Sequence, residues 1–247
     1  MDKKILPDLG IGELIEILLA QIRVFDAGLA SGTNLIDPFA TLLEKFEFEF
    51  DNMDDWRNSE IARQRQKNLM NKIGDLHQRI IGKLDGWECH ETNTGMPDVV
   101  GNRGSQKIIA EVKNKHNTMN ARSSKATYES LAEMLSSPKF RGYVGVVVHI
   151  IGPRERHGNF WKPFTATGCP ARDDIIVMNG RTFYAIATDP EMRQPTVNFG
   201  SNENIRYWPT WCAIDEMVEQ FFKAVEKLYG GSVPTWVKDL VPQALSE

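Results

Sequence analysis

The stretch 96–115, MPDVVGNRGSQKIIAEVKNK, constrains the fold of this chain more than any other stretch. It begins with a short strand entered through Pro97 and continues into a polar turn that contains Gly101 and Gly104. It then enters IIAEV, which is rich in the β-branched residues that favour strands. We therefore predict a β-hairpin in this stretch.

The second strand of the predicted hairpin has two unlike faces, because side chains alternate across a strand. Ile108, Ala110 and Val112 form an apolar face. The other face carries Ile109, Glu111 and Lys113. A carboxylate and an ammonium two residues apart are also common on solvated surfaces, so this pair does not identify a functional site by itself.

Asp98 lies one strand upstream, and a hairpin of this length brings it beside Glu111. Two adjacent carboxylates repel each other unless a cation lies between them. Oxygen ligands of this kind suit Mg²⁺, which often bridges to phosphate. Such an ion would polarise a phosphate and acidify a bound water, and Lys113 could orient that water or stabilise developing negative charge. This chemistry is phosphodiester hydrolysis.

Pro97-Asp98, followed after twelve residues by Glu111-Val112-Lys113, resembles the signature of the PD-(D/E)xK nuclease superfamily, which includes many type II restriction endonucleases. The resemblance implies that the first acid and the D/E residue bind the metal and that the lysine assists the water. It assigns catalysis to Asp98, Glu111 and Lys113, and metal binding to Asp98, Glu111 and Val112. The implied cofactor is Mg²⁺, and the implied fold is α/β, with a mixed central sheet flanked by helices.

A narrower resemblance comes from the amino-acid sequence around the motif, from IGDLHQ upstream and from the chain length. These features are similar to the restriction enzymes that cut GGNCC. The resemblance implies double-stranded DNA as the substrate and a two-fold homodimer in which each subunit cuts one strand. It also implies a cognate DNA methyltransferase that protects the same site without having to bind this chain.

Composition sets the outer bounds. A chain of 247 residues with 41% hydrophobic residues can bury a full core, and we expect one elaborated domain. No segment has the roughly 20 apolar residues that span a bilayer, and the opening lacks a signal-peptide pattern, so we expect a cytoplasmic protein without membrane contact. Three widely spaced cysteines indicate neither a disulfide framework nor a zinc site, and we expect buried free thiols.

The net charge of −4 is unevenly distributed. Residues 1–55 hold 4 basic and 12 acidic side chains, whereas residues 101–160 hold 10 basic and 4 acidic ones. The basic segment includes the predicted site and continues beyond it, as expected of a phosphate-binding surface, although a solvated basic face is the alternative. The DNA-binding candidates are Lys115, Asn117, Arg122, Lys125, Arg154, Arg156 and Asn159.

The chain before the motif has helical periodicity. We predict helices over 12–29 and 34–50, and we expect Leu42, Leu43 and Phe46 to face inward. Residues 1–55 then form an acidic N-terminal layer with a structural or subunit-contact role. A long helix over 56–84 leads into the catalytic core at 56–151.

Several residues near the core could support the site. His77 is either a core histidine or a group that supports the metal ligands or contacts DNA. A strand over 87–92 places Glu88 and Glu91 on opposite faces, so at most one of them joins the metal site. Glu60, on the flank of the long helix, is the remaining candidate for a further acid, and Glu91 is a candidate for supporting the metal ligands without binding the ion.

After the motif we predict a helix capped by Ser123 or Ser124 and then a buried strand over 141–151, which implies a parallel strand pairing. Residues 152–174 are typical of a functional loop, and we expect a DNA-recognition loop with arginines suited to guanine, with a loop that has no role in function as the alternative. Asn179-Gly180 between two apolar runs predicts a hairpin over 175–188, and a C-terminal helix follows.

The sequence therefore predicts a magnesium-dependent type II restriction endonuclease. A repair or structure-selective nuclease with the same core and a catalytically inactive DNA-binding module are the alternatives. The intact set of Asp98, Glu111 and Lys113 favours an active enzyme.

Overall fold

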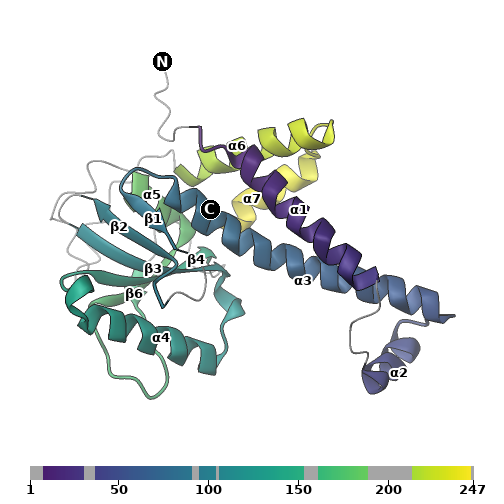
Figure 1. Ribbon diagram of the computed structural model, residues 1–247, viewed down its shortest axis with the longest axis horizontal. Helices are drawn as coiled ribbons and strands as arrows, with labels where there is room; N and C mark the ends of the chain where they lie inside the picture. Colours follow the sequence, from purple (N-terminus) through teal and green to yellow (C-terminus); the bar gives the residue numbers. More distant parts are fainter. Residues whose placement is uncertain are drawn as a thin grey trace. The chain divides into compact units, whose positions relative to one another are not determined.

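The computed structural model describes residues 8–30, 37–90, 95–103, 106–152, 161–188 and 213–245 (Figure 1). The chain forms two compact units, one of Glu13–Leu76 and one of Met1–Gly12 with His77–Glu247. The boundaries that we predicted at residues 55 and 151 do not coincide with this division. One helix is continuous across residue 55, and the central sheet continues beyond residue 151.

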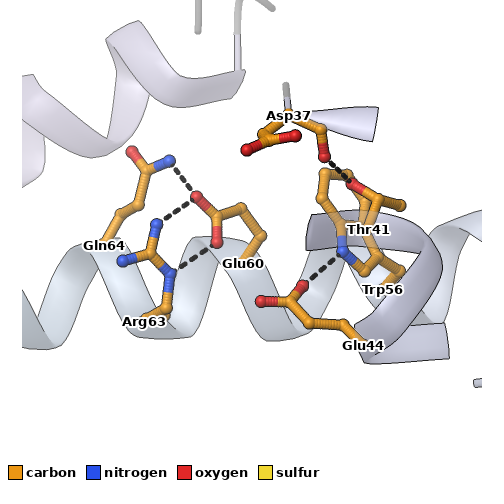
Figure 2. A network of polar contacts seen from close by, with 7 residues as sticks. All are labelled: Asp37, Thr41, Glu44, Trp56, Glu60, Arg63 and Gln64. Atoms are coloured by element: carbon orange, nitrogen blue, oxygen red, sulfur yellow. Dashed lines mark hydrogen bonds and ion pairs between the residues drawn. The ribbon is translucent and has the colours of Figure 1, made fainter. Parts of the chain in front are cut away.

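The smaller unit is helical. It contains most of α1 (Ile11–Ala30), all of α2 (Pro38–Glu47) and the greater part of α3 (Met53–Gly82). Helix α2 begins where Asp37 caps it, because this carboxylate accepts hydrogen bonds from the main-chain N–H groups of Phe39 and Ala40. The indole N–H of Trp56 donates a 2.8 Å hydrogen bond to Glu44 and thereby joins α3 to α2 (Figure 2).

The prediction that Leu42, Leu43 and Phe46 face inward is wrong. These side chains are 57%, 72% and 74% exposed, and α2 has no buried residue. Helical periodicity predicts which residues share a face, but it does not show that the same chain covers that face. The contact of α2 with α3 that Figure 2 shows is the polar one between Glu44 and Trp56.

The larger unit is built on a mixed sheet of six strands in the order β1-β2-β3-β4-β6-β5. Strand β3 runs parallel to β4, and β4 runs parallel to β6, whereas the remaining neighbours are antiparallel. The predicted mixed α/β sheet is therefore confirmed. The strands are β1 (Trp87–Cys89), β2 (Val99–Arg103), β3 (Gln106–Lys115), β4 (Val144–Ile151), β5 (Trp161–Pro163) and β6 (Ile175–Asn179).

One face of the sheet packs against α4 (Ala121–Ser136), which lies along it in Figure 1. The predicted serine cap of this helix is wrong, since Asn120 is the N-cap and accepts a 2.9 Å hydrogen bond from the Ser123 N–H. The core on this face combines helix and strand residues. Its buried members are Ile109, Tyr128, Leu131, Leu135, Phe140, Val147, Phe164, Ile175 and Val177.

The other face packs against α5 (Gly180–Thr188), so the predicted hairpin over 175–188 is wrong. Asn179 does not form a hairpin turn. It accepts a 2.8 Å hydrogen bond from the Thr182 N–H at the start of the helix. A Cβ on Gly180 would lie 2.6 Å from the Ile150 carbonyl oxygen, so glycine is needed where the helix passes β4. The Asn-Gly pair therefore begins a helix beside a neighbouring strand.

The C-terminal part of the larger unit is helical. Helix α6 (Ala213–Tyr229) confirms the predicted C-terminal helix, and Ile214 and Met217 are its buried apolar residues. Gly230 follows it with a φ of 69°, a conformation that glycine adopts without strain. Two short 3-10 helices, η1 (His116–Thr118) and η2 (Pro138–Phe140), and α7 (Thr235–Leu245) complete the described elements. No helix among the described residues is long and apolar enough to cross a membrane.

Candidate active site

The predicted hairpin is present, and it brings the two acids together. Strands β2 and β3 are antiparallel, with Val99 opposite Ala110, so Asp98 lies opposite Glu111 one position further along. Gly101 lies within β2 rather than in the turn, opposite Trp87, whose ring would be 2.7 Å from a Cβ at this position. The predicted turn residue Gly104 lies outside the described residues.

Asp98, Glu111 and Lys113 converge on the sheet face that packs against α4. The ammonium of Lys113 lies 3.1 Å from Glu111 Oε2 and 3.8 Å from Asp98 Oδ2. The side chain of Lys113 is 29% exposed, that of Glu111 16% and that of Asp98 13%. The group is therefore sheltered but open to a ligand. Since α4 packs against Ile109 and Val147 on this face, the polar residues lie beyond the helix-covered part, towards the C-terminal end of β3.

The electrostatics of the group suit a cation. Burial and the neighbouring Asp98 carboxylate raise the pKa of Glu111, and Lys113 partly opposes this effect. A divalent cation would relieve the repulsion, and Mg²⁺ is commonly held by one or two carboxylates together with water and phosphate oxygens. Val112 could contribute its main-chain carbonyl oxygen, because its side chain is buried and apolar. Asp98, Glu111 and Val112 thus fit a magnesium ion.

Further acids do not join this pair in the described part of the chain, where no group of three or more His, Cys, Asp and Glu side chains could hold a metal ion. Glu88 lies on the same face, but it is exposed. It pairs with Val100, which lies two residues after Asp98 along the chain. Glu60 belongs to the smaller unit, where Arg63 and Gln64 bind its carboxylate (Figure 2). Glu91 lies outside the described residues.

His77 is a core histidine in this structure. Its ring lies in the interior, with Nδ1 3.3 Å from the hydroxyl of Tyr184 on α5, which packs on the sheet face away from α4. Burial lowers the pKa of His77 to about 4. Of the two interpretations of His77 that the sequence left open, the structure therefore favours the core histidine.

The expectation of buried thiols is wrong for Cys89, which is exposed.

The described DNA-binding candidates follow the site along the chain. Lys115 ends β3, Asn117 lies in η1 and Arg122 lies in the first turn of α4, and all three side chains are exposed. Lys125 is exposed as well, and it forms an ion pair of 3.7 Å with Glu129. The remaining candidates, Arg154, Arg156 and Asn159, lie outside the described residues.

Sequence reasoning missed two histidines on the same face of the sheet. His149 lies opposite Lys113 on the neighbouring strand β4, and His90 lies opposite Asp98, whose carbonyl oxygen accepts a 3.0 Å hydrogen bond from the His90 N–H. The alternation of side chains along β4 could have shown that His149 lies on the opposite face from its apolar neighbours in the sequence. Its proximity to Lys113 follows from the register of the parallel pair, which the sequence does not specify.

The model of the family described as Eco47II restriction endonuclease matches residues 17–194, which include both strands of the hairpin, α4 and β6. The chain belongs to the Eco47II restriction endonuclease family. This membership confirms the predicted resemblance to type II restriction endonucleases, and the mixed sheet flanked by helices is consistent with their fold.

Two curated proteins are similar to this member of the family. The type II restriction enzyme Eco47II of Escherichia coli is 35% identical over 164 residues, which cover 63% of this chain and 66% of that enzyme. The type II restriction enzyme Sau96I of Staphylococcus aureus is 26% identical over 130 residues, which cover 50% of this chain and 48% of that enzyme. The matched region thus spans just under two thirds of the first relative and about half of the second.

Proposed function

We propose that this protein is a magnesium-dependent endonuclease that cleaves double-stranded DNA at a specific short site. The observation that carries the proposal is the convergence of Asp98, Glu111 and Lys113 at one end of the sheet in a member of a restriction endonuclease family. The resemblance to enzymes that cut GGNCC makes this sequence the proposed site.

In the proposed reaction, the two carboxylates and the Val112 carbonyl oxygen would hold Mg²⁺. When bound, the ion polarises the phosphate and lowers the pKa of a coordinated water. In the metal-free protein Lys113 is the counter-charge to both carboxylates, since its ammonium lies within 4 Å of each. With their charge balanced by the ion, Lys113 is available to orient the attacking water and to stabilise the negative charge that develops on the phosphate.

The proposed DNA contacts divide into two kinds. Lys115, Asn117, Arg122 and Lys125 follow the site in the chain and contact backbone phosphates, which position the duplex without reading its sequence. Arg154, Arg156 and Asn159 belong to the proposed recognition loop. Arginine can bind guanine O6 and N7 together, and each GGNCC half-site presents two adjacent G·C pairs.

A homodimer is part of the proposal, because a two-fold symmetric site is matched by a two-fold protein. The candidate contact is the apolar surface of α2 and the residues after it. Its members are Phe39, Leu42, Leu43, Phe46 and Phe48. At 57–79% exposure they present roughly 600 Å² per copy, taking about 200 Å² for each aromatic side chain and slightly less for leucine. Two copies would bury about 1,200 Å², the lower end of stable interfaces.

The acidic character of the same segment favours a second copy over DNA as the partner, since residues 1–55 hold 12 acidic and 4 basic side chains. Sedimentation of the wild-type chain and of Phe46→Glu tests the contact. We expect the wild type to sediment as a dimer and the variant as a monomer. Met53→Glu, at a side chain that is 60% exposed in the same unit, is the matched control and should remain dimeric. A dimer that persists in Phe46→Glu would place the contact elsewhere.

The function is tested by digesting DNA of known sequence with Mg²⁺ and sequencing the fragment ends. We expect every end to map to GGNCC, with the unspecified central pair on the two-fold axis. Ends at another fixed sequence would reject GGNCC but keep the endonuclease. Ends without a consensus would favour a structure-selective nuclease, and binding without cleavage would favour an inactive DNA-binding module. The cognate methyltransferase is tested by methylating the same site, which should block cutting.

A further inference from the structure

The sheet face that carries Glu111 and Lys113 continues beyond them with basic and hydrogen-bonding side chains. His149 on β4 lies opposite Lys113, and Asn179 on β6 lies opposite His149. Lys162 on β5 lies opposite Val177, a member of the α4-side core, and so points to the same face. Neighbouring strands lie about 4.8 Å apart, so β5 lies roughly 14 Å from β3 across three strand spacings.

His149 is a neutral group within this basic part of the face. Burial lowers its pKa to about 4, and the nearby basic residues His116, Lys113 and Lys162 act in the same direction. These three basic residues belong to η1, β3 and β5, yet all act on one imidazole. The basic side chains thus gather beside the carboxylate pair, although they are separated along the chain.

The same group lacks partners within the described part of the chain. The Nε2 atom of His149 is buried and has no hydrogen-bond partner there. A buried nitrogen of this kind is unfavourable unless a group from another molecule forms a hydrogen bond with it. Lys162 and His116 are exposed, and neither forms an ion pair with a described carboxylate. Lys113 differs from them, because two carboxylates balance its charge.

We propose that Lys162, His116 and His149 form a second phosphate site, which holds the DNA backbone beside the phosphate that is cut. This inference rests on the proposed nuclease function and adds three residues that are not among the DNA-binding candidates predicted from the sequence. Lys162 supplies the fixed positive charge, and His116 acts on the same imidazole from η1. His149 is the neutral member, and its Nε2 hydrogen-bonds to the bound strand directly or through one water.

The position of the second phosphate site fixes its role. It extends along the sheet from Lys113 towards β5, away from β2 and from Asp98, which precedes β2. A strand bound there is held on one side of the carboxylate pair, so that its next phosphates reach Glu111 and Lys113. The site thus positions the backbone and does not read the sequence, because phosphate contacts are the same for every base pair.

Lys162→Ala tests the charge contribution. The probe is a 30-base-pair duplex containing one GGNCC site, and binding is measured without divalent metal over a series of salt concentrations. Each lost phosphate contact should reduce the slope of log K against log salt by about 0.9, so that the variant binds about eightfold more weakly than the wild type at 0.1 M salt if the two proteins bind equally at 1 M. A duplex without the site should show the same loss.

Lys83→Ala is the matched control. Lys83 is exposed, lies in the larger unit and precedes β1. The first residue of β1, Trp87, pairs with Gly101 at the end of the sheet that lies away from Lys113. We expect the slope of Lys83→Ala to equal that of the wild type. An unchanged slope for Lys162→Ala would overturn the second phosphate site, as would an equal loss in both variants.

His149 is tested by two substitutions, His149→Gln and His149→Leu. Glutamine keeps a side-chain N–H that can reach a phosphate oxygen, whereas leucine has no polar atom. We expect His149→Leu to weaken binding about tenfold without changing the salt slope, since the imidazole is neutral, and His149→Gln to recover most of the loss. Circular dichroism of both variants checks the fold. Equal binding by correctly folded His149→Leu and wild type would remove His149 from the site.

The second phosphate site and the nuclease proposal fail in different ways. If the wild type cleaves DNA but Lys162→Ala keeps its salt slope, the second phosphate site is wrong and the nuclease proposal stands. If the wild type binds DNA with a Lys162-dependent slope but never cleaves, the phosphate site stands and the catalytic proposal is wrong. If the wild type does not bind the duplex, both are wrong.

Discussion

The main-chain N–H of Val112 donates a 2.8 Å hydrogen bond to Asp98 Oδ2 and thereby ties the first acid to the strand that carries the second. Asp98 precedes β2, and this bond joins its side chain to β3. The bond fixes the orientation of the Asp98 carboxylate relative to β3. The hairpin therefore fixes the carboxylate pair before any cation binds.

Asp98→Asn should separate this structural role from catalysis. The amide can still accept the bond from the Val112 N–H, so we expect its free energy of unfolding to stay within about 1 kcal/mol of the wild type. Asp98→Ala leaves that N–H without its partner and should be about 1 kcal/mol less stable than the asparagine variant. Urea denaturation and plasmid cleavage measure the two effects. We expect both variants to be inactive, and magnesium-dependent cutting by Asp98→Asn would contradict the assignment.

Glu111 should make the metal-free protein less stable as the pH rises. The folded state raises the pKa of Glu111 above its ordinary value of 4.5, so it binds more protons than the unfolded state above about pH 4.5. The stabilising contribution of the protonated form is present below pH 4.5 and is lost as the pH rises through the raised pKa. Denaturation in chelator at several pH values, with wild type and Glu111→Gln side by side, measures this.

The wild type and Glu111→Gln share the buried histidines. The difference between their stabilities at each pH therefore reports the ionisation of Glu111. We expect Glu111→Gln to gain stability relative to the wild type as the pH rises, and Mg²⁺ to restore stability to the wild type alone. Parallel stability curves for the two proteins would show that Glu111 does not carry the repulsion.

Lys113→Met should keep the metal site but lose cleavage. The substitution removes the ammonium that lies 3.1 Å from Glu111 while leaving both carboxylates in place. Calorimetric titration with Ca²⁺ at pH 8 should show that a divalent ion still binds. Plasmid cleavage with Mg²⁺ should be lost, because no group orients the water or stabilises the phosphate charge. Cleavage near the wild-type rate would make Lys113 a structural counter-charge alone.

Gly180→Ala tests why the Asn-Gly pair begins a helix. A Cβ at this position would lie 2.6 Å from the Ile150 carbonyl oxygen, so α5 must shift from β4. We expect a loss of about 1–3 kcal/mol in the free energy of unfolding, as is typical of overpacking. Gly74→Ala, whose Cβ would meet nothing within 4 Å, is the control and should not destabilise. An equally small effect at both positions would show that the contact between α5 and β4 adapts.

Local patterns predicted the part of the fold that surrounds the site. Strand alternation correctly placed Ile109, Glu111 and Lys113 on one face, and the apolar run of β4 correctly predicted a parallel strand. These patterns succeed because a hairpin and a strand-helix-strand unit bring nearby segments together. The convergence of Asp98 and Glu111 follows from the hairpin alone.

Long-range relations were beyond these patterns. The same Asn-Gly pair suits a hairpin turn or a helix start, and the contact with Ile150 decides between them. The proximity of Lys113 to His149 depends on the register between β3 and β4, which tertiary packing sets. Phe46 on α2 shows a further limit, since an amphipathic pattern does not show whether its apolar face is covered within the chain.

Cleavage of a supercoiled plasmid by wild type and Glu111→Gln, each with Mg²⁺ and with chelator, tests the central claim most directly. Glutamine keeps the size of the side chain and removes the charge needed to hold the ion beside Asp98. We predict discrete fragments from the wild type with Mg²⁺ and intact plasmid in the other three reactions. Equal cleavage by Glu111→Gln, or cleavage by the wild type in chelator, would contradict a magnesium-dependent nuclease centre at Asp98, Glu111 and Lys113.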